Sequence, residues 1–235
     1  MPYPLPRWFA HRGGGSLAPE NTLAGIRLAA SLGYQAVEFD VMLSGDGTPV
    51  LIHDETLERT TNGTGPVSET PDAVLFGLDA GCGERIPRLS EAALLCRQLG
   101  LLANVEIKPA AGVEEKTAEA IARLADELWQ GALVPPLFSS FSPLALAVAR
   151  QLAPNIPRGL LYEAVPSHWP DDMKRLDVVS LHCAADLLSD AVLDEAKARH
   201  IPVLCYTVNV PEQANRLFAR GVGSLFTDHL DRFAP

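Results

Sequence analysis

The stretch AVEFDVMLSGDGTPVLIHD, residues 36–54, decides the fold of this 235-residue chain. It contains two apolar runs rich in β-forming residues: residues 36–41, continuing to Leu43, and residues 49–53. The link between them, Ser-Gly-Asp-Gly at 44–47, is too short for a parallel crossover, which needs a dozen or more residues. Gly-Asp-Gly suits a tight turn. The stretch therefore predicts a β-strand whose chain folds back on it as a hairpin.

This hairpin brings polar residues from its two strands towards each other. Pairing outward from the turn places Leu43 opposite Thr48 and, by the same count, Glu38 opposite His53. We therefore expect His53 to return to the strand end that carries Glu38 and Asp40. These two carboxylates are two residues apart, so they point to the same side of the strand.

Strand-like and helix-like runs alternate along the rest of the chain. The predicted strands are residues 8–10, 36–41, 101–107, 136–140, 158–161, 178–181, 203–208 and 224–227. The predicted helices are residues 22–32, 90–99, 113–129, 143–152, 189–199 and 211–219. Such repetition predicts a parallel sheet with helices outside it. Eight strands over this length predict a closed (β/α)8 TIM barrel.

An open, doubly wound sheet is the alternative architecture. It usually carries Gly-x-Gly-x-x-Gly after its first strand, and the turn HRGGGSLAPE at residues 11–20 lacks that pattern. We therefore expect one barrel domain over residues 1–235. Residues 54–88 are rich in Thr, Gly and Pro and exceed an ordinary loop in length. They predict a small inserted subdomain that caps the barrel mouth.

Composition excludes several classes of protein. An apolar content of 47% with 20% charged residues is typical of a globular protein, and the net charge of −10 argues against a nucleic-acid binder. Apolar stretches are too short to span a bilayer, and the first residues do not resemble a signal peptide. Four cysteines without a CxxC pair indicate reduced thiols. We expect a cytoplasmic protein with no stable membrane association; whether it forms a homodimer is left open.

Polar residues gather where the predicted strands end. In barrel enzymes the active site is built at the carboxyl ends of the strands. Burying this many charged groups is costly unless they pair or bind metal, so the pattern points to one site. The strand-end residues are His11, Arg12, Glu38, Asp40, His53, Asp54, Glu106, Lys108, Thr207, Asn209, Thr227 and Asp228.

Three of these residues, Glu38, Asp40 and Glu106, form a set of hard oxygen donors. No thiolate accompanies them, so the set favours Mg²⁺ or Ca²⁺ over zinc. The alternative is a buried ion network in which the carboxylates pair with Arg12 and Lys108.

The histidines and Arg12 suggest phosphate chemistry. His11 and His53 suit a pair in which one accepts and the other donates a proton. Arg12 offers a fork that matches a phosphate, and we expect the three glycines after it to expose backbone N–H groups to an anion. Acid, base, divalent metal and arginine together indicate phosphoryl transfer. The other histidines are interpreted as structural: His168, His182, His200 and His229.

Six sequence blocks together resemble the glycerophosphodiester phosphodiesterase family, in its bacterial cytoplasmic type. They are AHRGGGSLAPENT, VEFDVMLSGDGTPVLIHDETLERTTNGTG, IPRLSEAALL, NVEIKP, YTVN and LFTD. The resemblance covers almost the whole chain. It implies a TIM barrel with an inserted subdomain, and hydrolysis of glycerophosphodiesters to sn-glycerol 3-phosphate and an alcohol.

The resemblance also implies residue roles. His11 and His53 match the catalytic pair, and Arg12 and Lys108 match phosphate contacts. The metal ligands it implies are Glu38, Asp40 and Glu106, and the candidates for the pocket are Glu20, Tyr206 and Asn209. Tyr206 stands where the family commonly has Trp, and TDHL lacks the usual proline after Thr-Asp. Both differences concern the preference for a headgroup.

Two other functions remain as alternatives. A related barrel phosphodiesterase acting on (lyso)phospholipids would need an apolar rim or a basic membrane face, for which the net charge of −10 is unfavourable. A catalytically inactive barrel that binds a phosphodiester would be expected to lack a histidine or a carboxylate of the site, and none is missing here.

Overall fold

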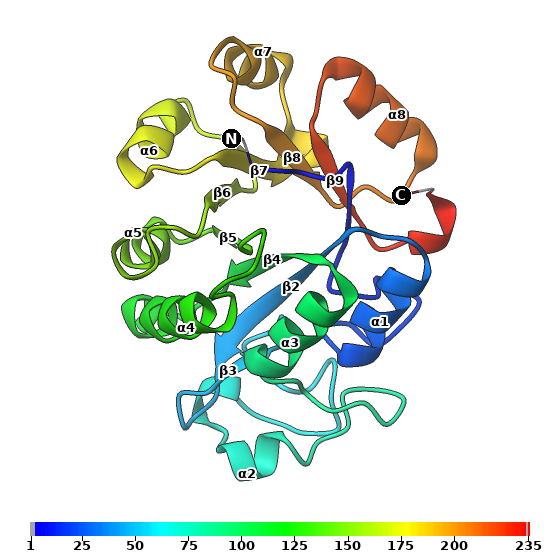
Figure 1. The fold of residues 1–235 in the computed structure, drawn as a ribbon, viewed down its shortest axis with the longest axis vertical. Coiled ribbons are helices and arrows are strands. Elements are labelled where there is room, and N and C mark those ends of the chain that lie inside the picture. The colour runs from blue at the N-terminus through cyan, green and yellow to red at the C-terminus, as the bar shows by residue number, and fades with distance from the viewer. Residues whose placement is uncertain (1–2, 234) are drawn as a thin grey trace.

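The computed structural model describes residues 3–233 and 235 of the chain. Eight parallel strands close into a barrel because β1 pairs with both β9 and β2, and the helices lie outside the ring (Figure 1). This confirms the predicted (β/α)8 fold. The barrel strands are β1 (Trp8–Ala10), β2 (Ala36–Leu43), β4 (Leu102–Ile107), β5 (Leu137–Ser140), β6 (Arg158–Tyr162), β7 (Ser180–Ala184), β8 (Val203–Tyr206) and β9 (Ser224–Thr227).

Seven α-helices cover the barrel. They are α1 (Leu23–Ser31), α3 (Leu89–Leu99), α4 (Glu114–Leu128), α5 (Pro143–Leu152), α6 (Trp169–Leu176), α7 (Asp190–Ala198) and α8 (Pro211–Arg220). Helix α5 shows why the sequence forms them. The Ser142 hydroxyl accepts a hydrogen bond from the N–H of Ala145, Pro143 opens the first turn, and Leu146 and Ala149 are buried on one face.

Helix α6 is absent from the sequence prediction. It has eight residues, four of them charged, and Pro170 stands in its first turn. Its buried residues are Trp169, Met173 and Leu176, a spacing that matches one face of a short helix. Strand β7 also begins and ends later than predicted, so His182 lies within it rather than after it.

The barrel interior has an apolar half and a polar half. Phe9, Ala36, Leu204 and Phe226 form a buried cluster inside the barrel, in which the rings of Phe9 and Phe226 stack at 4.9 Å. Because side chains alternate along a strand, the next inward positions lie one layer closer to the carboxyl ends. Those positions carry the charged groups. The apolar cluster therefore closes the barrel below the site.

The hairpin is confirmed, but its predicted register is wrong by one residue. Strand β3 (Pro49–Leu51) is antiparallel to β2, with Leu43 opposite Pro49 and Val41 opposite Leu51. Ser44 and Thr48 close the turn through their N–H groups, so the loop has three residues, and Gly47 has a φ of 84°. A left-handed residue is the usual requirement of such a loop. Ile52 then donates to the Asp40 carbonyl, which places His53 beside the β2 end.

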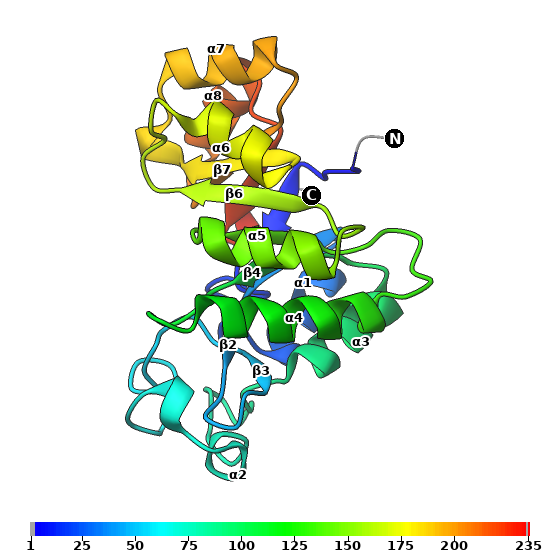
Figure 2. The ribbon, with the colours of Figure 1, turned by 90° about the vertical axis from the view of Figure 1, so that its left-hand side faces the viewer.

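Residues 54–88 lie to one side of the strand ends, beyond β2 and β3 (Figures 1 and 2). They include a 3₁₀ turn, η1 (Val67–Glu69), and the short helix α2 (Asp72–Leu75). Leu57, Val67, Leu75 and Ile86 form a buried cluster with residues of the hairpin. Two further 3₁₀ turns, η2 (Ala185–Leu187) and η3 (Leu230–Arg232), occur elsewhere.

Two further predictions can be compared with the structure. All four cysteines are free, and three of them are buried as the apolar runs predict: Cys96, Cys183 and Cys205. Within residues 3–233, every helix is too short or too polar to cross a membrane.

Candidate active site

The strand-end residues of the sequence analysis meet around one cavity of about 150 Å³ at the carboxyl end of the barrel. The apolar residues of its lining include Phe141, Leu161 and Phe226. A cavity lined by both apolar and polar side chains is typical of small-molecule sites. The predicted residues that line it are His11, Arg12, Glu38, Asp40, His53, Glu106, Lys108, Tyr206 and Thr207.

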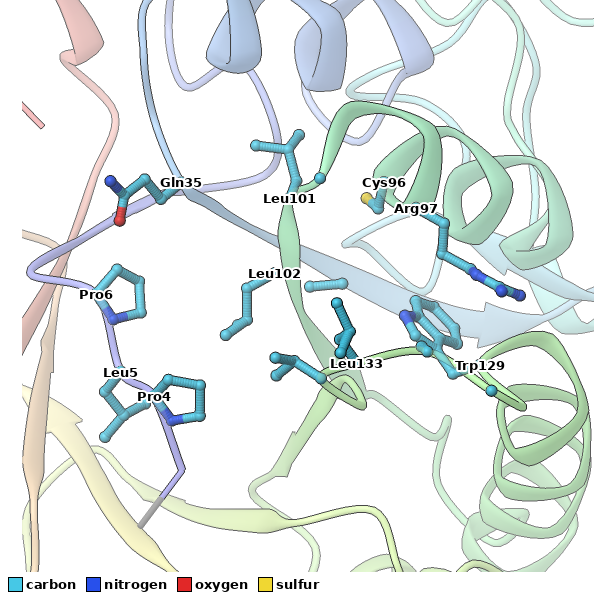
Figure 3. Close-up of a pocket in the computed structure, with 15 residues that line it drawn as sticks. Pro4, Leu5, Pro6, Gln35, Cys96, Arg97, Leu101, Leu102, Trp129 and Leu133 are labelled. Atoms are coloured by element: carbon cyan, nitrogen blue, oxygen red, sulfur yellow. The ribbon is translucent and has the colours of Figure 1, made fainter. Parts of the chain in front are cut away.

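A larger hollow of about 730 Å³ lies at the other end of the barrel, where β1, β2, β4 and β5 begin (Figure 3). Its wall is mainly apolar and includes Leu5, Leu102 and Trp129. Among the described residues that line it, Cys96 and Arg97 are the titratable ones. It lacks the combination of acid, base and carboxylates that the smaller cavity has.

Glu38, Asp40 and Glu106 come together because β2 and β4 are neighbouring strands in which Asp40 is paired with Glu106. One carboxylate oxygen from each lies within 4.8 Å of the others, and the three side chains are buried. Asn21 holds the middle carboxylate: its amide donates to Asp40 Oδ2 at 2.9 Å and accepts from the Asp40 N–H at 3.1 Å. Lys108 Nζ lies 3.3 Å from Asp40 Oδ1.

The three carboxyls differ in their proton affinity. Burial and the neighbouring Asp40 raise the pKa of Glu106 to about 8, and burial with both neighbouring carboxylates raises the pKa of Glu38 well above its ordinary value. Burial also acts to raise the pKa of Asp40. The charges of Lys108, His53 and Arg12 with the Asn21 hydrogen bond outweigh burial and hold that pKa below its usual range.

These residues fit a divalent cation. Oε1 of Glu38 and Oε1 of Glu106 are buried and have no hydrogen-bond partner among the described residues. Unpartnered buried carboxylate oxygens are costly, and oxygen donors of this kind are the ligands that Mg²⁺ and Ca²⁺ prefer. The alternative ion network accounts for Asp40, which contacts Lys108 and lies 3.8 Å from Arg12. It does not account for the two glutamates.

His11 follows β1 and is oriented by the end of β9. Its Nδ1 lies 2.7 Å from Asp228 Oδ1, and Asn209 donates to Asp228 Oδ2 at 3.1 Å. Asn209 also accepts from the Asp228 N–H. Burial would raise the pKa of Asp228, but the bonds from His11 and Asn209 lower it to about 2. An ionised carboxylate only accepts hydrogen bonds, so Nδ1 carries the proton and Nε2 faces the cavity.

His53 has an equivalent arrangement built from adjacent residues. Its Nδ1 lies 2.6 Å from Oδ1 of Asp54. Partial burial lowers the pKa of His53, and the positive charges of Lys108 and Arg12 lower it further. Asp40 and Asp54 act to raise this pKa, but the lowering effects are larger. His11 and His53 are therefore each held by a carboxylate on Nδ1, which leaves Nε2 for proton transfer.

Arg12 contacts carboxylates on both its backbone and its side chain. Its Nη1 donates to Glu20 Oε1 at 3.0 Å, and its backbone N–H donates to Glu38 Oε2 at 2.9 Å. The prediction that the three glycines after Arg12 expose backbone N–H groups to an anion is wrong. The N–H groups of Gly13, Gly14 and Gly15 donate to carbonyls of the chain.

The glycines instead allow close packing of the loop. A Cβ on Gly14 would lie 2.8 Å from Gly25 Cα in α1, and one on Gly15 would lie 2.2 Å from the Asp228 carbonyl oxygen. The loop therefore brings Arg12 and the Asp228 segment together, and its small residues serve that packing.

Of the three pocket candidates, Tyr206 lines the cavity, while Glu20 and Asn209 lie behind it. The Tyr206 hydroxyl donates to the Tyr162 carbonyl at 2.8 Å, and burial raises the pKa of this phenol, so it stays neutral. Glu20 contacts Arg12, and Asn209 contacts Asp228.

Four residues of the site had no functional role predicted from the sequence. Asp54 and Asp228 stood among the strand-end residues without a role, and Asn21 lies in the Pro-Glu-Asn-Thr run at residues 19–22. His182 was interpreted as structural. It is fully buried in β7 and reaches the cavity wall, where its Nε2 contacts Ser180 Oγ at 2.9 Å and burial lowers its pKa to about 3.

The family model described as glycerophosphoryl diester phosphodiesterase matches residues 11–232. The chain belongs to this family. Within it, the chain is 34% identical to a glycerophosphodiester phosphodiesterase of Caldanaerobacter subterraneus subsp. tengcongensis, over 93% of this chain and 92% of that one. It is 31% identical to a glycerophosphodiester phosphodiesterase of Bacillus altitudinis, over 95% of both chains.

Solved structures of the family agree with the fold. An Oleispira antarctica phosphodiesterase, solved in complex with the product sn-glycerol-3-phosphate, is 40% identical and superposes with a TM-score of 0.92 over 97% of this chain and 95% of that one. A glycerophosphodiester phosphodiesterase of Agrobacterium tumefaciens is 27% identical, with a TM-score of 0.80 over 98% of this chain and 99% of that one.

Proposed function

We propose that this chain hydrolyses glycerophosphodiesters to sn-glycerol 3-phosphate and an alcohol. The observation that carries the proposal is the pairing of His11 with Asp228 and of His53 with Asp54 around one cavity. Two oriented imidazoles beside cationic side chains are what acid–base cleavage of a phosphodiester needs. The Oleispira antarctica relative, whose structure holds sn-glycerol-3-phosphate, supports the choice of product.

The two histidines act through Nε2, because a carboxylate holds each Nδ1. One accepts the proton of the attacking hydroxyl, and the other donates a proton to the alkoxide of the leaving alcohol. Arg12 and Lys108 line the same cavity and balance the charge that develops on the phosphate oxygens. Asn21 keeps Asp40 in place beside Lys108.

Glu38, Asp40 and Glu106 would hold one divalent ion, Mg²⁺ or Ca²⁺. When bound, such an ion supplies positive charge that polarises a phosphoryl oxygen. It also removes the cost of the two unpartnered glutamate oxygens, Glu38 Oε1 and Glu106 Oε1.

The attacking group in our proposal is the substrate's own glycerol hydroxyl, on the carbon next to the phosphate ester. An oriented intramolecular nucleophile gains several kcal/mol over free water. Its oxygen bonds to phosphorus, the bond to the leaving alcohol breaks, and a five-membered cyclic phosphate forms. Water then opens that ring to give glycerol 3-phosphate. Direct attack by water is the competing route.

We also propose that residues 54–88 form a subdomain that bounds the mouth on the His53 side. Thr60 and Thr61 border a small crevice that also contacts Glu20 and His53. The main cavity of about 150 Å³ is small, which supports soluble headgroups rather than diacyl lipids as substrates.

A panel of glycerophosphodiesters tests the proposed function. Purified protein is incubated with glycerophosphocholine, glycerophosphoethanolamine and glycerophosphoinositol, with and without chelator, and the products are separated and identified. Release of glycerol 3-phosphate from at least one substrate, abolished by chelator and restored by Mg²⁺ or Ca²⁺, is the expected result. A protein that binds these compounds and releases no product would instead be the inactive binding barrel.

A further inference from the structure

Arg59 lies in residues 54–88 and binds two carboxylates at once. Its Nη1 and Nη2 donate to Glu20 at 2.7 and 2.8 Å, and its Nε and Nη2 donate to Asp54 at 2.6 and 2.9 Å. One planar guanidinium therefore presents two edges to two acids. Paired N–H···O bonds of this kind are among the strongest polar contacts in proteins.

Both carboxylates also contact residues of the active site. Asp54 Oδ1, which accepts from Arg59 Nη2, is also the atom 2.6 Å from His53 Nδ1. Glu20 Oε1, which accepts from the same Nη2, also accepts from Arg12 Nη1 at 3.0 Å. A single nitrogen of Arg59 thus contacts the two oxygens that bind His53 and Arg12.

We propose that Arg59 is a positioning residue that fixes His53 and Arg12 for the same reaction; this inference rests on the proposed function. Through Asp54 it holds the imidazole with Nε2 towards the cavity. Arg59 also binds Glu20, whose carboxylate would otherwise pair with Arg12 alone. Arg12 therefore stays available to the phosphate.

The ionisation of Asp54 and Glu20 agrees with this role. Hydrogen bonds from Arg59 are the main cause that holds the pKa of Asp54 below its usual range. Burial would raise the pKa of Glu20, but the bond from Arg59 and the charges of Arg12 and Arg59 lower it. Both acids therefore stay ionised near neutral pH, and each remains an acceptor for the cavity residue it contacts.

Arg59 does not hold the segment in place by itself. Its side chain is 47% exposed, whereas Leu57, Val67 and Leu75 are buried in the apolar cluster of the segment. Glu84 also ties the segment to α1 by accepting from the Ala24 N–H at 3.1 Å. Removing the guanidinium should therefore leave the fold intact.

Arg59→Ala, Arg59→Lys and a matched control, Arg85→Ala, test the inference. Arg85 is an exposed arginine of the same segment. Steady-state kinetics are measured with glycerophosphocholine at saturating Mg²⁺. We expect Arg59→Ala to lower kcat about 10- to 100-fold, the size of effect seen when the partner of an active-site ligand is removed, and to raise KM. Arg59→Lys keeps the charge but lacks the fork, so it should restore only part of either loss. Arg85→Ala should match the parent protein.

A double-mutant comparison separates positioning from general damage. If Arg59 acts on kcat through Asp54, Arg59→Ala combined with Asp54→Asn should lose no more kcat than Asp54→Asn alone. The inference would be overturned if the kcat losses of Arg59→Ala and Asp54→Asn multiplied in the double variant. It would also be overturned if Arg59→Ala had the same kinetics as Arg85→Ala.

A readout independent of turnover completes the test. The Nδ1 proton of His53, held by Asp54, should give a downfield resonance in ¹H–¹⁵N spectra that persists in Arg85→Ala and disappears in Arg59→Ala. Persistence in Arg59→Ala would overturn the link to His53. If the parent protein shows this resonance and its dependence on Arg59 but hydrolyses no glycerophosphodiester, the proposed function fails and the structural link stands.

Discussion

Nδ1 of His11 lies 2.7 Å from Oδ1 of Asp228, a residue 217 positions away along the chain. The contact exists because β1 and β9 are neighbours in the closed barrel, with Ala10 paired with Thr227. The residue that follows each strand therefore meets its counterpart at the same end. Barrel closure thus gives His11 a carboxylate partner.

Asp228→Asn should retain the barrel but lower kcat by roughly 10²- to 10⁴-fold, because an amide can stabilise the wrong imidazole tautomer. The kcat of Asp228→Asn is compared with the kcat of a control variant, Asp231→Asn. Asp231 is an exposed acid of the same terminal segment. Equal activity in the two variants would remove Asp228 from the mechanism.

The ionised carboxylate of Asp228 should also stabilise the fold, and this contribution should be lost in acid. Its folded-state pKa of about 2 lies below the ordinary value of 3.8. Its contribution is therefore fully present above about pH 4 and is lost as the pH falls towards 2. Urea unfolding between pH 5 and 2 should show a shallower loss of stability for Asp228→Asn than for the parent protein.

His11→Ala and His53→Ala should each lower kcat about 10²- to 10⁴-fold, the usual worth of general acid–base catalysis. The parent protein should show a bell-shaped dependence of rate on pH. His168→Ala is the control, because His168 is exposed and is not among the residues that line the cavity. Near-normal turnover in either cavity variant would exclude that histidine from the reaction.

The chelated protein should lose stability as the pH rises. The folded-state pKa of Glu106 is about 8 against an ordinary 4.5, so between these values the unfolded state has released a proton that the folded state keeps. Stability then falls with increasing pH by about 1.4 kcal/mol per unit for each such carboxyl. Thermal unfolding with and without Mg²⁺ or Ca²⁺ should show a larger gain in Tm at pH 8 than at pH 5.

Glu106→Gln provides the control for that measurement. It removes one titrating carboxyl and one donor of the three-acid cluster. The variant should show a flatter pH dependence when chelated and a smaller gain in Tm with metal. A cation effect on Tm that is the same in Glu106→Gln and the parent protein would place the ion elsewhere.

A substrate that lacks the hydroxyl on the carbon next to the phosphate ester decides the route of attack. If the cyclic phosphate is formed, the 2-deoxy analogue should bind but turn over orders of magnitude more slowly, because the intramolecular nucleophile is gone. Binding is measured as inhibition of glycerophosphocholine hydrolysis. Undiminished turnover of the analogue would establish direct attack by water.

Soluble glycerophosphodiesters should be cleaved much faster than phospholipids in vesicles. The cavity of about 150 Å³ is too small for a diacyl glycerol moiety. Rates are compared for glycerophosphocholine, lysophosphatidylcholine and phosphatidylcholine vesicles at equal phosphate concentration. Efficient cleavage of the intact bilayer would contradict our assignment of residues 54–88 as a boundary of the mouth.

Local pattern was enough to predict most of the fold. The strand–helix alternation, the short link at Ser44–Gly47 and the caps of helices such as α5 are determined by neighbouring residues, so they can be read along the chain. The same holds for the donor set, since Glu38 and Asp40 are two apart on one strand and therefore share a side. Helix α6 was missed because it has only eight residues, four of them charged, and its buried face is short.

Tertiary structure decided how most of the site residues are partnered. Closure of the barrel joined His11 to Asp228, and the pairing of β1 with β2 brought Asn21 to Asp40. The donors of the glycine loop could not be assigned from sequence either, because whether a backbone N–H is free depends on the carbonyls that other segments bring to it. The sequence thus determined which chemical groups reach the carboxyl end of the barrel. The contacts between distant segments determined which of those groups are neutralised, oriented or left open to a ligand.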